Sequence, residues 1–162
     1  VSSFERKSVY DMIMIPHVAN CKGVMGSGFV IPLARHFPLA KLRYLDLFPE
    51  KTDILGYTQF VADETGPVTV ANMVAQTLGG RRPLNYAALV ACMNQVADRI
   101  HSYRSQYSAK AEIMAPMFGS GLAGGNWEFI AELIHDIWTG TGIPVTVFYL
   151  PNNVPPHLQP RP

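Results

Sequence analysis

Residues 12–29 read MIMIPHVANCKGVMGSGF, and this stretch decides the fold. Its first half is an apolar run, which is typical of a strand that is buried on both faces. Its second half contains Gly23, Gly26 and Gly28, which allow a sharp turn and bring backbone N–H groups close to a ligand. The stretch therefore predicts a buried strand over residues 9–15, followed by a glycine loop.

A second glycine loop, GSGLAGGN at residues 119–126, follows the short strand pattern AEIMAPMF. Each loop leads into a segment with helical periodicity, FVIPLARHF after the first and WEFIAELIHDIW after the second. Two such loops would place backbone N–H groups and two helix N-termini around one crevice, which suits a pyrophosphate. The alternative is that these glycines only permit tight turns between strand and helix. That alternative would be usual for one glycine-rich loop but is less expected for two. We expect Gly121 to need a positive φ that a β-branched residue cannot adopt.

The rest of the chain alternates between strand and helix patterns. YTQFVAD and VTVANMVA, separated by ETGP, predict a hairpin, and PVTVFYL predicts a closing strand. Asn85 is expected to cap a long helix with apolar residues at three- and four-residue steps. Pro32 is expected to break the helix after the first loop, and residues 38–48 fit either helix or extended chain. The alternation predicts an α/β fold with a mostly parallel sheet.

Composition limits the classes of function. The 162 residues, 48% of them hydrophobic, suffice for one core, so we expect one domain over residues 1–150 and a Pro-rich, disordered tail over residues 151–162. A net charge of +1 gives no broad surface for nucleic acid or anionic lipid. Two cysteines and the lack of a membrane-span or leader pattern favour a soluble, cytoplasmic domain with reduced thiols. The start at Val1 leaves open an additional domain in a longer chain.

Standard nucleotide and metal motifs do not fit. Gly119, Gly121 and Gly124 match G-x-G-x-x-G, but only one more strand follows, whereas a dinucleotide fold needs most of a further βαβ unit. The first loop lacks the Lys-Ser or Lys-Thr of a nucleoside-triphosphate loop. Metal-binding spacing of His, Cys, Asp and Glu is also missing from the sequence, so neither a metal nor a cofactor is expected.

The segments IPHVANCKGVMGSGFVIPLARHFP (residues 15–38) and APMFGSGLAGGNWEFIAELI (residues 115–134) resemble the macro domain family. The resemblance is to the branch that includes the yeast ADP-ribose-1″-phosphate phosphatase and the terminal ADP-ribose glycohydrolase. VTVANMVAQ, PLNYAALVACMNQV and IPVTVFYL also occur in the family's order. The resemblance implies a three-layer α/β/α sandwich with a mostly parallel mixed sheet. It also implies binding of ADP-ribose or a 1″-substituted derivative.

The same resemblance implies a ligand site, position by position. Asn20 would hydrogen-bond the distal ribose, and the first loop would surround that ribose and the adjoining phosphate. The second loop would hold the diphosphate, and Phe148 or Tyr149 would pack on adenine. The implied ligand-binding residues are Asn20, Gly23, Val24, Met25, Gly26, Ser27, Gly28, Gly119, Ser120, Gly121, Leu122, Ala123, Gly124, Phe148 and Tyr149.

Departures from the family pattern leave two classes of function. The usual Gly-Asp pair that binds adenine does not precede Tyr10, so either the sequence lacks its true start or adenine recognition is altered. The family's lysine and aspartate are missing near residues 76–77 and at Ala123. His17 aligns with a histidine of the phosphatase and, with Asn20, is a candidate for acid or base catalysis. A histidine bonded to backbone at a strand end is an equal alternative. We favour a ligand-sensing module, and the alternative is a hydrolase of ADP-ribose-1″-phosphate or a related ADP-ribosyl adduct.

For four further side chains near the loops, we expect a role in packing or on the surface rather than in catalysis. Cys21 has no evident partner base in the sequence and is expected to pack as a small residue. Arg81 and Arg82 fit solvated loop charges, with a contact to a phosphate as the alternative. Trp127 is expected to pack against the second glycine loop rather than contact the ligand.

Overall fold

The computed structural model describes residues 11–48 and 54–149. Its elements, in chain order, are β1 (Met12–Asn20), α2 (Val30–His36), α3 (Pro38–Leu45), β2 (Thr58–Ala62), β3 (Val68–Gln76), α4 (Tyr86–Tyr107), β4 (Ala111–Pro116), α5 (Trp127–Ile137), the 3₁₀ turn η1 (Thr139–Thr141) and β5 (Val145–Phe148). The tail predicted over residues 151–162 lies outside the described residues.

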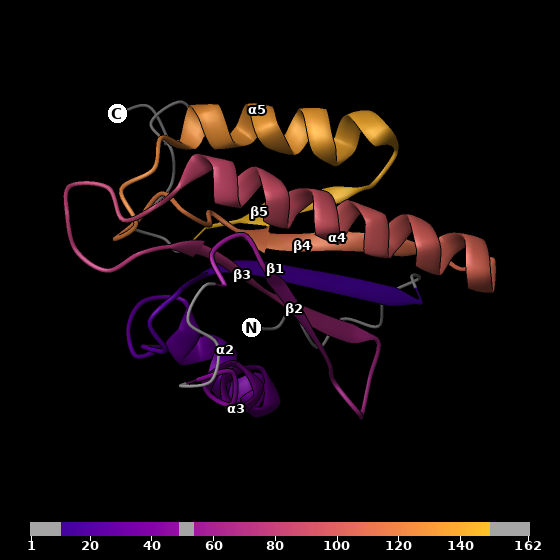
Figure 1. The fold of residues 1–162 in the computed structure, drawn as a ribbon. Coiled ribbons are helices and arrows are strands. Elements are labelled where there is room, and N and C mark those ends of the chain that lie inside the picture. Colours follow the sequence, from indigo (N-terminus) through magenta and orange to yellow (C-terminus); the bar gives the residue numbers. More distant parts are fainter. Residues whose placement is uncertain (1–10, 49–53, 150–162) are drawn as a thin grey trace, which may run out of the picture.

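The five strands form one sheet in the order β2-β3-β1-β4-β5. Only β2 is antiparallel to its neighbour, which confirms the hairpin predicted with β3. Helices α4 and α5 cover one face of the sheet, and α2 and α3 cover the other (Figure 1). The predicted three-layer α/β/α fold with a mostly parallel mixed sheet is confirmed.

The first half of strand β1 is apolar because both faces of the sheet are covered. Met12 and Met14 belong to the core beneath α4 and α5, whereas Ile13 and Ile15 belong to the core with Leu33 of α2. None of these side chains is more than 7% exposed. Alternate residues of one strand therefore fill two separate cores, as expected of a central strand in a layered α/β fold.

The strand predicted over residues 9–15 has the wrong boundaries. Strand β1 spans Met12–Asn20, and Asp11 lies in a bend just before it. The strand continues so far because its pairing with β3 continues, and even the N–H of Cys21 donates to the carbonyl of Gln76 at 2.9 Å. Asn20 is therefore the last residue of a strand rather than a residue inside the loop.

Pro16 lies where the pairing between β1 and β4 stops. The N–H of Met12 donates to the residue before β4, and the N–H of Ile13 donates to the residue before β3. By alternation, the nitrogen of Pro16 faces β4, where proline has no hydrogen to donate. The register with β4 ends at Met14, whereas the register with β3 continues to Asn20. The carboxyl ends of β1 and β4 are therefore not paired with each other, and ligands of α/β sheets bind in such places.

Two helices differ from the sequence prediction. Pro32 does not break α2, because it lies in the first turn of that helix, where N–H groups have no partner within the helix. The ambiguous residues 38–48 contain helix α3, with Pro38 at its first position. The expected break instead falls at Phe37, between the two helices.

Asparagine side chains begin the two longer helices. Asn85 caps α4 as predicted, and its Oδ1 accepts a hydrogen bond from the N–H of Ala88 at 2.9 Å. Asn126 caps α5 in the same way, accepting from the N–H of Phe129 at 3.1 Å. Within the described part of the chain, the helices are too short or too polar to cross a membrane.

Candidate ligand-binding site

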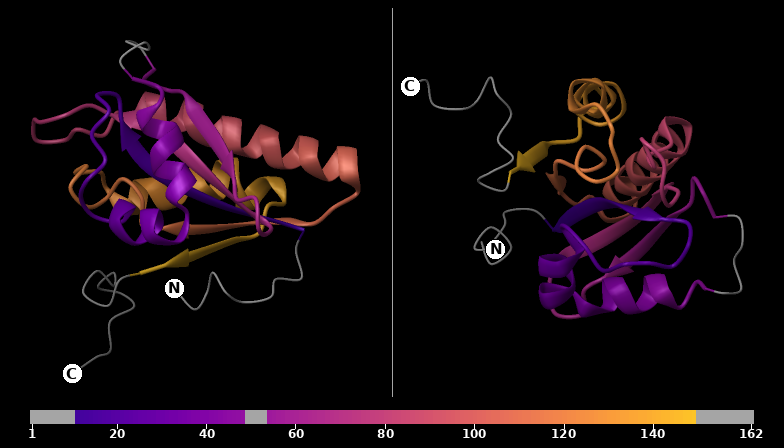
Figure 2. Two further views of the ribbon diagram at one scale, coloured as in Figure 1. Left: turned by 90° about the horizontal axis from the view of Figure 1, so that it is seen from below. Right: turned by 90° about the vertical axis from the view of Figure 1, so that its left-hand side faces the viewer.

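A cavity of about 1100 Å³ lies at the carboxyl ends of the parallel strands. It is lined by the loops that follow β1, β3 and β4, by the end of β5 and by the first residues of α2 and α5. These loops extend from the same end of the sheet in Figure 1, and the right-hand view of Figure 2 looks at that end. The fold thus brings the two glycine loops, more than 90 residues apart in sequence, to one cavity.

Most residues singled out from the sequence line this cavity. Of the residues implied to bind the ligand, all but Gly23 and Gly124 line it, and these two glycines have positive φ values of 78° and 75°. The lining also includes residues from a loop that the sequence interpretation missed, namely Gln76, Thr77, Leu78, Gly79 and Pro83. The glycine pair of LGGRRP, directly after a buried parallel strand, was the available signal for this third loop.

Asn20 shapes the first glycine loop. Its side chain is buried, and its Oδ1 accepts hydrogen bonds from the N–H of Lys22 (3.0 Å), the N–H of Val24 (3.2 Å) and the hydroxyl of Tyr44 (2.9 Å). Its Nδ2 donates one hydrogen to the carbonyl of Val24. The second hydrogen of Nδ2 has no partner among the described residues. Asn20 therefore builds the turn and keeps one donor that a ligand could use; its contact with ribose stays a prediction.

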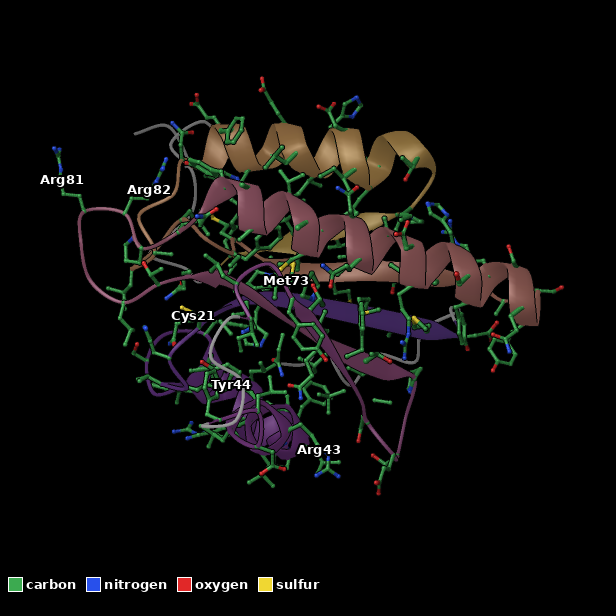
Figure 3. All side chains as sticks on the ribbon, in the orientation of Figure 1. Cys21, Arg43, Tyr44, Met73, Arg81 and Arg82 are labelled. Carbon is green, nitrogen blue, oxygen red and sulfur yellow. The ribbon has the colours of Figure 1, made fainter. Side chains whose placement is uncertain are left out.

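Tyr44 of α3 holds Asn20 in place through hydrogen bonds. The Tyr44 side chain is fully buried, and its hydroxyl also donates to the backbone carbonyl of Asn20 at 2.6 Å. Burial raises the pKa of Tyr44 to about 12, so the hydroxyl keeps the proton that it donates. Figure 3 shows Tyr44 beneath the loop that carries Cys21. The sequence did not point to Tyr44, because the structure of residues 38–48 was ambiguous.

His17 lines the cavity as a neutral hydrogen-bonded side chain. Its Nε2 lies 2.5 Å from Oδ1 of Asn72. The Nδ2 of Asn72 donates to the carbonyl of Ala40 (3.0 Å) and to Oε1 of Gln59 (3.1 Å), so Oδ1 of Asn72 is the acceptor and Nε2 of His17 carries the hydrogen. Burial lowers the pKa of His17 to about 4, while the bond to Asn72 acts in the opposite direction. Near neutral pH the imidazole is therefore uncharged and a weak base, and its Nε2 hydrogen is donated to Asn72.

Asn72 was not singled out from the sequence, although it carries the partner atom of His17. It is completely buried in β3, within the largely apolar run VTVANMVA. A polar residue in the middle of a strand that is buried on both faces must find a partner, which was the signal available at this position.

Aromatic rings form the wall of the cavity beside β5. The ring of Phe29 lies between His17 and Phe148, with centroid distances of 6.2 Å and 5.7 Å. Tyr149 also lines this part of the cavity. The wall offers flat apolar surface of the kind that packs against a planar base.

The second glycine loop is held by its own backbone. The N–H of Gly125 donates to the carbonyl of Gly119 at 2.7 Å, and that of Gly124 donates to Gly121 at 3.0 Å. Positive φ occurs at Gly119 and Gly124 but not at Gly121, so the predicted positive φ of Gly121 is wrong. A Cβ on Gly121 would meet nothing within 4 Å, whereas a Cβ on Gly124 would lie 2.8 Å from the carbonyl oxygen of Arg81.

The loop after β3 joins the two glycine loops. The N–H of Cys21 donates to the carbonyl of Gln76 at 2.9 Å, and the N–H of Leu84 donates to the carbonyl of Ala123 at 3.0 Å. These bonds connect the three loops at the β1–β3 side of the cavity, opposite the aromatic wall on β5. Cys21 itself does not line the cavity.

The two arginines of this third loop do not line the cavity. The guanidinium of Arg82 lies 4.4 Å from the centre of the Tyr86 ring. Arg81 points outward from the tip of the loop in Figure 3. Trp127 packs edge-on against Phe118, with a centroid distance of 6.1 Å, and also lines the cavity. Trp127 thus packs beside the second loop as expected, but its place in the lining leaves it open to a ligand.

The lining of the cavity contains neither lysine nor arginine among the residues that the structure describes. Glu128 is its one charged side chain, and His17 is neutral near pH 7. Across residues 11–48 and 54–149, the structure also lacks a cluster of three or more His, Cys, Asp or Glu side chains that could hold a metal ion. An anion in this cavity would therefore be held by backbone N–H groups and uncharged side chains.

A layered α/β/α domain with glycine loops and an aromatic wall around one cavity defines a class of small-molecule-binding domains. The sequence matches neither a protein-family model nor a curated protein. It is similar to a macrodomain protein from Streptomyces coelicolor, with 37% identity over 90% of this chain and 93% of that chain and a TM-score of 0.69. The chain belongs to the macrodomain family.

More distant solved structures share the fold. The macrodomain of Mycobacterium tuberculosis DarG is 20% identical over 88% of this chain and 91% of that chain, with a TM-score of 0.70. DarTG of Thermosipho africanus, whose structure is a complex with ADP-ribose, is 16% identical over 92% of this chain and 41% of that chain, with the same TM-score of 0.70. The resemblance to the macro domain family is thus confirmed by the Streptomyces coelicolor protein, and these two structures share its fold.

Replacing Gly124 by alanine is expected to destabilise the second loop. The residue needs a φ of 75°, and the added Cβ would lie 2.8 Å from the carbonyl oxygen of Arg81. Gly124→Ala should lower the free energy of unfolding by about 1–3 kcal/mol in denaturant titration. Gly121→Ala is the matched control and should stay within about 0.5 kcal/mol of the wild type. Equal effects of the two substitutions would contradict this account of the loop.

Tyr44→Phe is expected to destabilise the protein because it removes the hydroxyl that donates to both oxygens of Asn20. The loss should be about 1–3 kcal/mol, since a buried acceptor is left with fewer donors. Thermal and denaturant unfolding measure it. Tyr107→Phe, at a residue that is 62% exposed, is the control and should have little effect. A Tyr44→Phe protein as stable as this control would show that the hydroxyl does not hold the loop.

Proposed function

We propose that this protein is a ligand-sensing macrodomain that binds ADP-ribose or a 1″-substituted form of it. The observation that carries the proposal is that two glycine loops of the macrodomain type face one cavity at the carboxyl ends of parallel strands. The complex of Thermosipho africanus DarTG with ADP-ribose supports it through the shared fold.

In the proposed complex, the ligand spans the cavity from β5 to β3. Adenine packs on Phe148 or Tyr149, and backbone N–H groups of the second loop bind the diphosphate. The distal ribose lies at the first loop, where the remaining N–H of Asn20 donates to one of its hydroxyls. Because the lining carries no cation among the described residues, the diphosphate is recognised by aligned N–H dipoles rather than by ion pairs.

In this proposal, the described residues contribute stacking to adenine recognition. The sequence given shows no Gly-Asp pair before Tyr10, and Asp11 precedes β1, at the strand end opposite Asn20. The carboxylate of Asp11 also accepts a hydrogen bond from the N–H of Lys110 at 3.2 Å, outside the cavity. Asp11 therefore does not replace the missing aspartate. The aromatic wall is the element of the described chain that offers adenine a contact surface.

Hydrolysis of the 1″ bond is the second candidate function, and the position of His17 in the cavity lining favours it. Placement in the branch of the yeast phosphatase and the terminal glycohydrolase would fit such an activity. Gln76, Thr77 and Ala123 line the cavity and supply neither an amine nor a carboxylate. A neutral His17 that donates its Nε2 hydrogen to Asn72 could act only as a base through Nδ1. We therefore favour sensing over turnover.

We further propose that the macrodomain occupies residues 1–150 and that residues 151–162 form a Pro-rich tail. A sensing role would require a means of passing ligand occupancy on, such as an additional domain in a longer chain. The hydrogen bond from Cys21 to Gln76 joins residues 20–28 to the loop after β3. A change of conformation on ligand binding at the first loop would therefore be transmitted to this third loop.

Calorimetry tests the proposed function. ADP-ribose should bind at least about tenfold more tightly than ATP or NAD. Gly121→Val should weaken ADP-ribose binding at least about tenfold, because the open space around Gly121 admits the side chain at the expense of the ligand. Gly66→Val, in the β2–β3 turn outside the cavity lining, is the control and should bind as the wild type does. Binding of NAD without binding of ADP-ribose would contradict the proposal.

A further inference from the structure

Three polar side chains cross the sheet in one row. His17 of β1 lies opposite Asn72 of β3 in the strand register, and Asn72 lies opposite Gln59 of β2. Nε2 of His17 lies 2.5 Å from Oδ1 of Asn72, and Nδ2 of Asn72 donates to Oε1 of Gln59 at 3.1 Å. We refer to these three side chains as the polar row. It begins at the cavity, which His17 lines, and ends at Gln59, outside the cavity lining.

Carbonyl groups of α3, which covers this face of the sheet (Figure 1), fix the direction of the hydrogen bonds in the polar row. The carbonyl of Ala40 accepts from Nδ2 of Asn72 at 3.0 Å. The carbonyl of Arg43 accepts from Nε2 of Gln59 at 2.9 Å. Because a carbonyl cannot donate, each amide turns its nitrogen toward α3 and its oxygen along the row. The oxygen of Asn72 therefore faces His17, and the hydrogen of the imidazole is placed on Nε2.

Nδ1 of His17 is left as a bare acceptor at the cavity. The side chain is 2% exposed, and Nδ1 has no hydrogen-bond partner among residues 11–48 and 54–149. In the same part of the chain, every side-chain nitrogen or oxygen that is sealed from solvent has a partner. The small exposed part of His17 therefore includes Nδ1, and His17 lines the cavity. A ligand that covers this atom would leave a buried acceptor unpaired unless it donates a hydrogen bond.

The bare nitrogen selects the chemistry of the ligand group that it meets. An N–H or O–H group can donate to Nδ1, whereas an ionised phosphate oxygen has no hydrogen and would face its lone pair. The ring of His17 lies 6.2 Å from that of Phe29, in the aromatic wall. In ADP-ribose, the uncharged donors are the amino group of adenine and the hydroxyls of the two riboses.

We propose that Asn72 and Gln59 are positioning residues of the ligand site, which hold His17 in the tautomer whose Nδ1 accepts a hydrogen bond from an uncharged N–H or O–H group of the ligand. This inference rests on the proposed function and adds to it a requirement on the ligand. Neither amide lines the cavity, so both act on the ligand only through His17. Their orientation is set by α3 before a ligand binds.

The ring nitrogens of His17 test the tautomer and the contact. Long-range ¹H–¹⁵N spectra of protein labelled at its histidine rings should show Nε2 protonated and Nδ1 bare, and loss of a signal in His17→Gln identifies it. Saturating ADP-ribose should shift the resonance of Nδ1 toward that of a hydrogen-bonded nitrogen and leave Nε2 unchanged. A hydrogen on Nδ1 in the free protein, or an unmoved Nδ1 at saturation, would overturn the inference and leave the proposed function standing. Failure of ADP-ribose to bind in calorimetry would overturn both.

Two substitutions at His17 separate the ligand contact from the structural bond. The amide nitrogen of a glutamine can take the place of Nε2 and donate to Asn72, but it leaves no acceptor at the place of Nδ1. The amide oxygen of an asparagine can take the place of Nδ1 but does not reach Asn72. His17→Gln should bind ADP-ribose at least about tenfold more weakly at near wild-type stability. His17→Asn should keep more of the affinity and lose more of the stability. A His17→Gln protein with wild-type affinity would overturn the inference.

A change of base identifies the donor. The analogue of ADP-ribose with hypoxanthine in place of adenine carries a carbonyl where adenine has its amino group. If the amino group donates to Nδ1, the wild type should bind this analogue at least about tenfold more weakly than ADP-ribose, and His17→Gln should bind both alike. If a ribose hydroxyl donates, His17→Gln should weaken both ligands by the same factor. Either result supports an acceptor at Nδ1, and wild-type affinity of His17→Gln for both ligands overturns it.

Gln59→Leu tests the positioning role at a residue outside the cavity. The substitution leaves one Nδ2 hydrogen of Asn72 without its acceptor, so the orientation of Asn72 is less strongly fixed. The form of His17 with its hydrogen on Nδ1 should become detectable in the ¹⁵N spectra. Affinity for ADP-ribose should fall at least about threefold.

Gln95→Leu is the matched control for Gln59→Leu. Both glutamines are partly buried, and Gln95 also makes two hydrogen bonds, with the carbonyl of Gly56 at 2.7 Å and the N–H of Thr58 at 2.9 Å. Gln95 lies on α4 and has no bond to the polar row, so Gln95→Leu should lower stability without changing the tautomer or the affinity. A wild-type tautomer and affinity in Gln59→Leu, or the same changes in Gln95→Leu, would overturn the positioning role.

Discussion

The missing hydrogen of Pro16 determines where this sheet opens. The nitrogen of Pro16 faces β4, so pairing between β1 and β4 stops at Met14, whereas pairing with β3 continues to Asn20. The carboxyl ends of two neighbouring parallel strands are thereby left without hydrogen bonds to each other. Both glycine loops leave the sheet at this place, and the cavity lies between them. The strand order places the cavity at this end of the sheet, and the missing donor at Pro16 coincides with the end of the β1–β4 pairing.

The loops around this opening are ordered before a ligand arrives. The first depends on the side chain of Asn20, which is held by Tyr44 from the layer below, and the second depends on backbone bonds between its own glycines. Because both loops already have these internal hydrogen bonds without a ligand, less ordering is left for binding to bring about. The described lining is nearly free of charge, so specificity comes from the direction of N–H groups and from shape.

Local patterns in the sequence predicted the layers, the hairpin, the Asn85 cap and the glycine loops, because each depends on periodicity or turn chemistry over a few residues. The end of β1 was not predicted, since its continuation depends on pairing with β3. The partner of His17 lies 55 residues away and that of Asn20 lies 24 residues away, so only the fold brings them together. Resemblance to the macrodomain family placed the loops correctly, but it gave no reason to choose Tyr44.

The central claim is that backbone N–H groups of the two glycine loops bind the diphosphate of ADP-ribose. A ¹⁵N NMR titration of the uniformly labelled protein with ADP-ribose tests it most directly. The account predicts that amide shifts concentrate in residues 20–28 and 119–125, follow one dissociation constant and weaken only modestly with added salt. Shifts concentrated instead in the smaller cavity between α3 and β2, near Leu39 and Val61, with both glycine loops unchanged, would contradict the account.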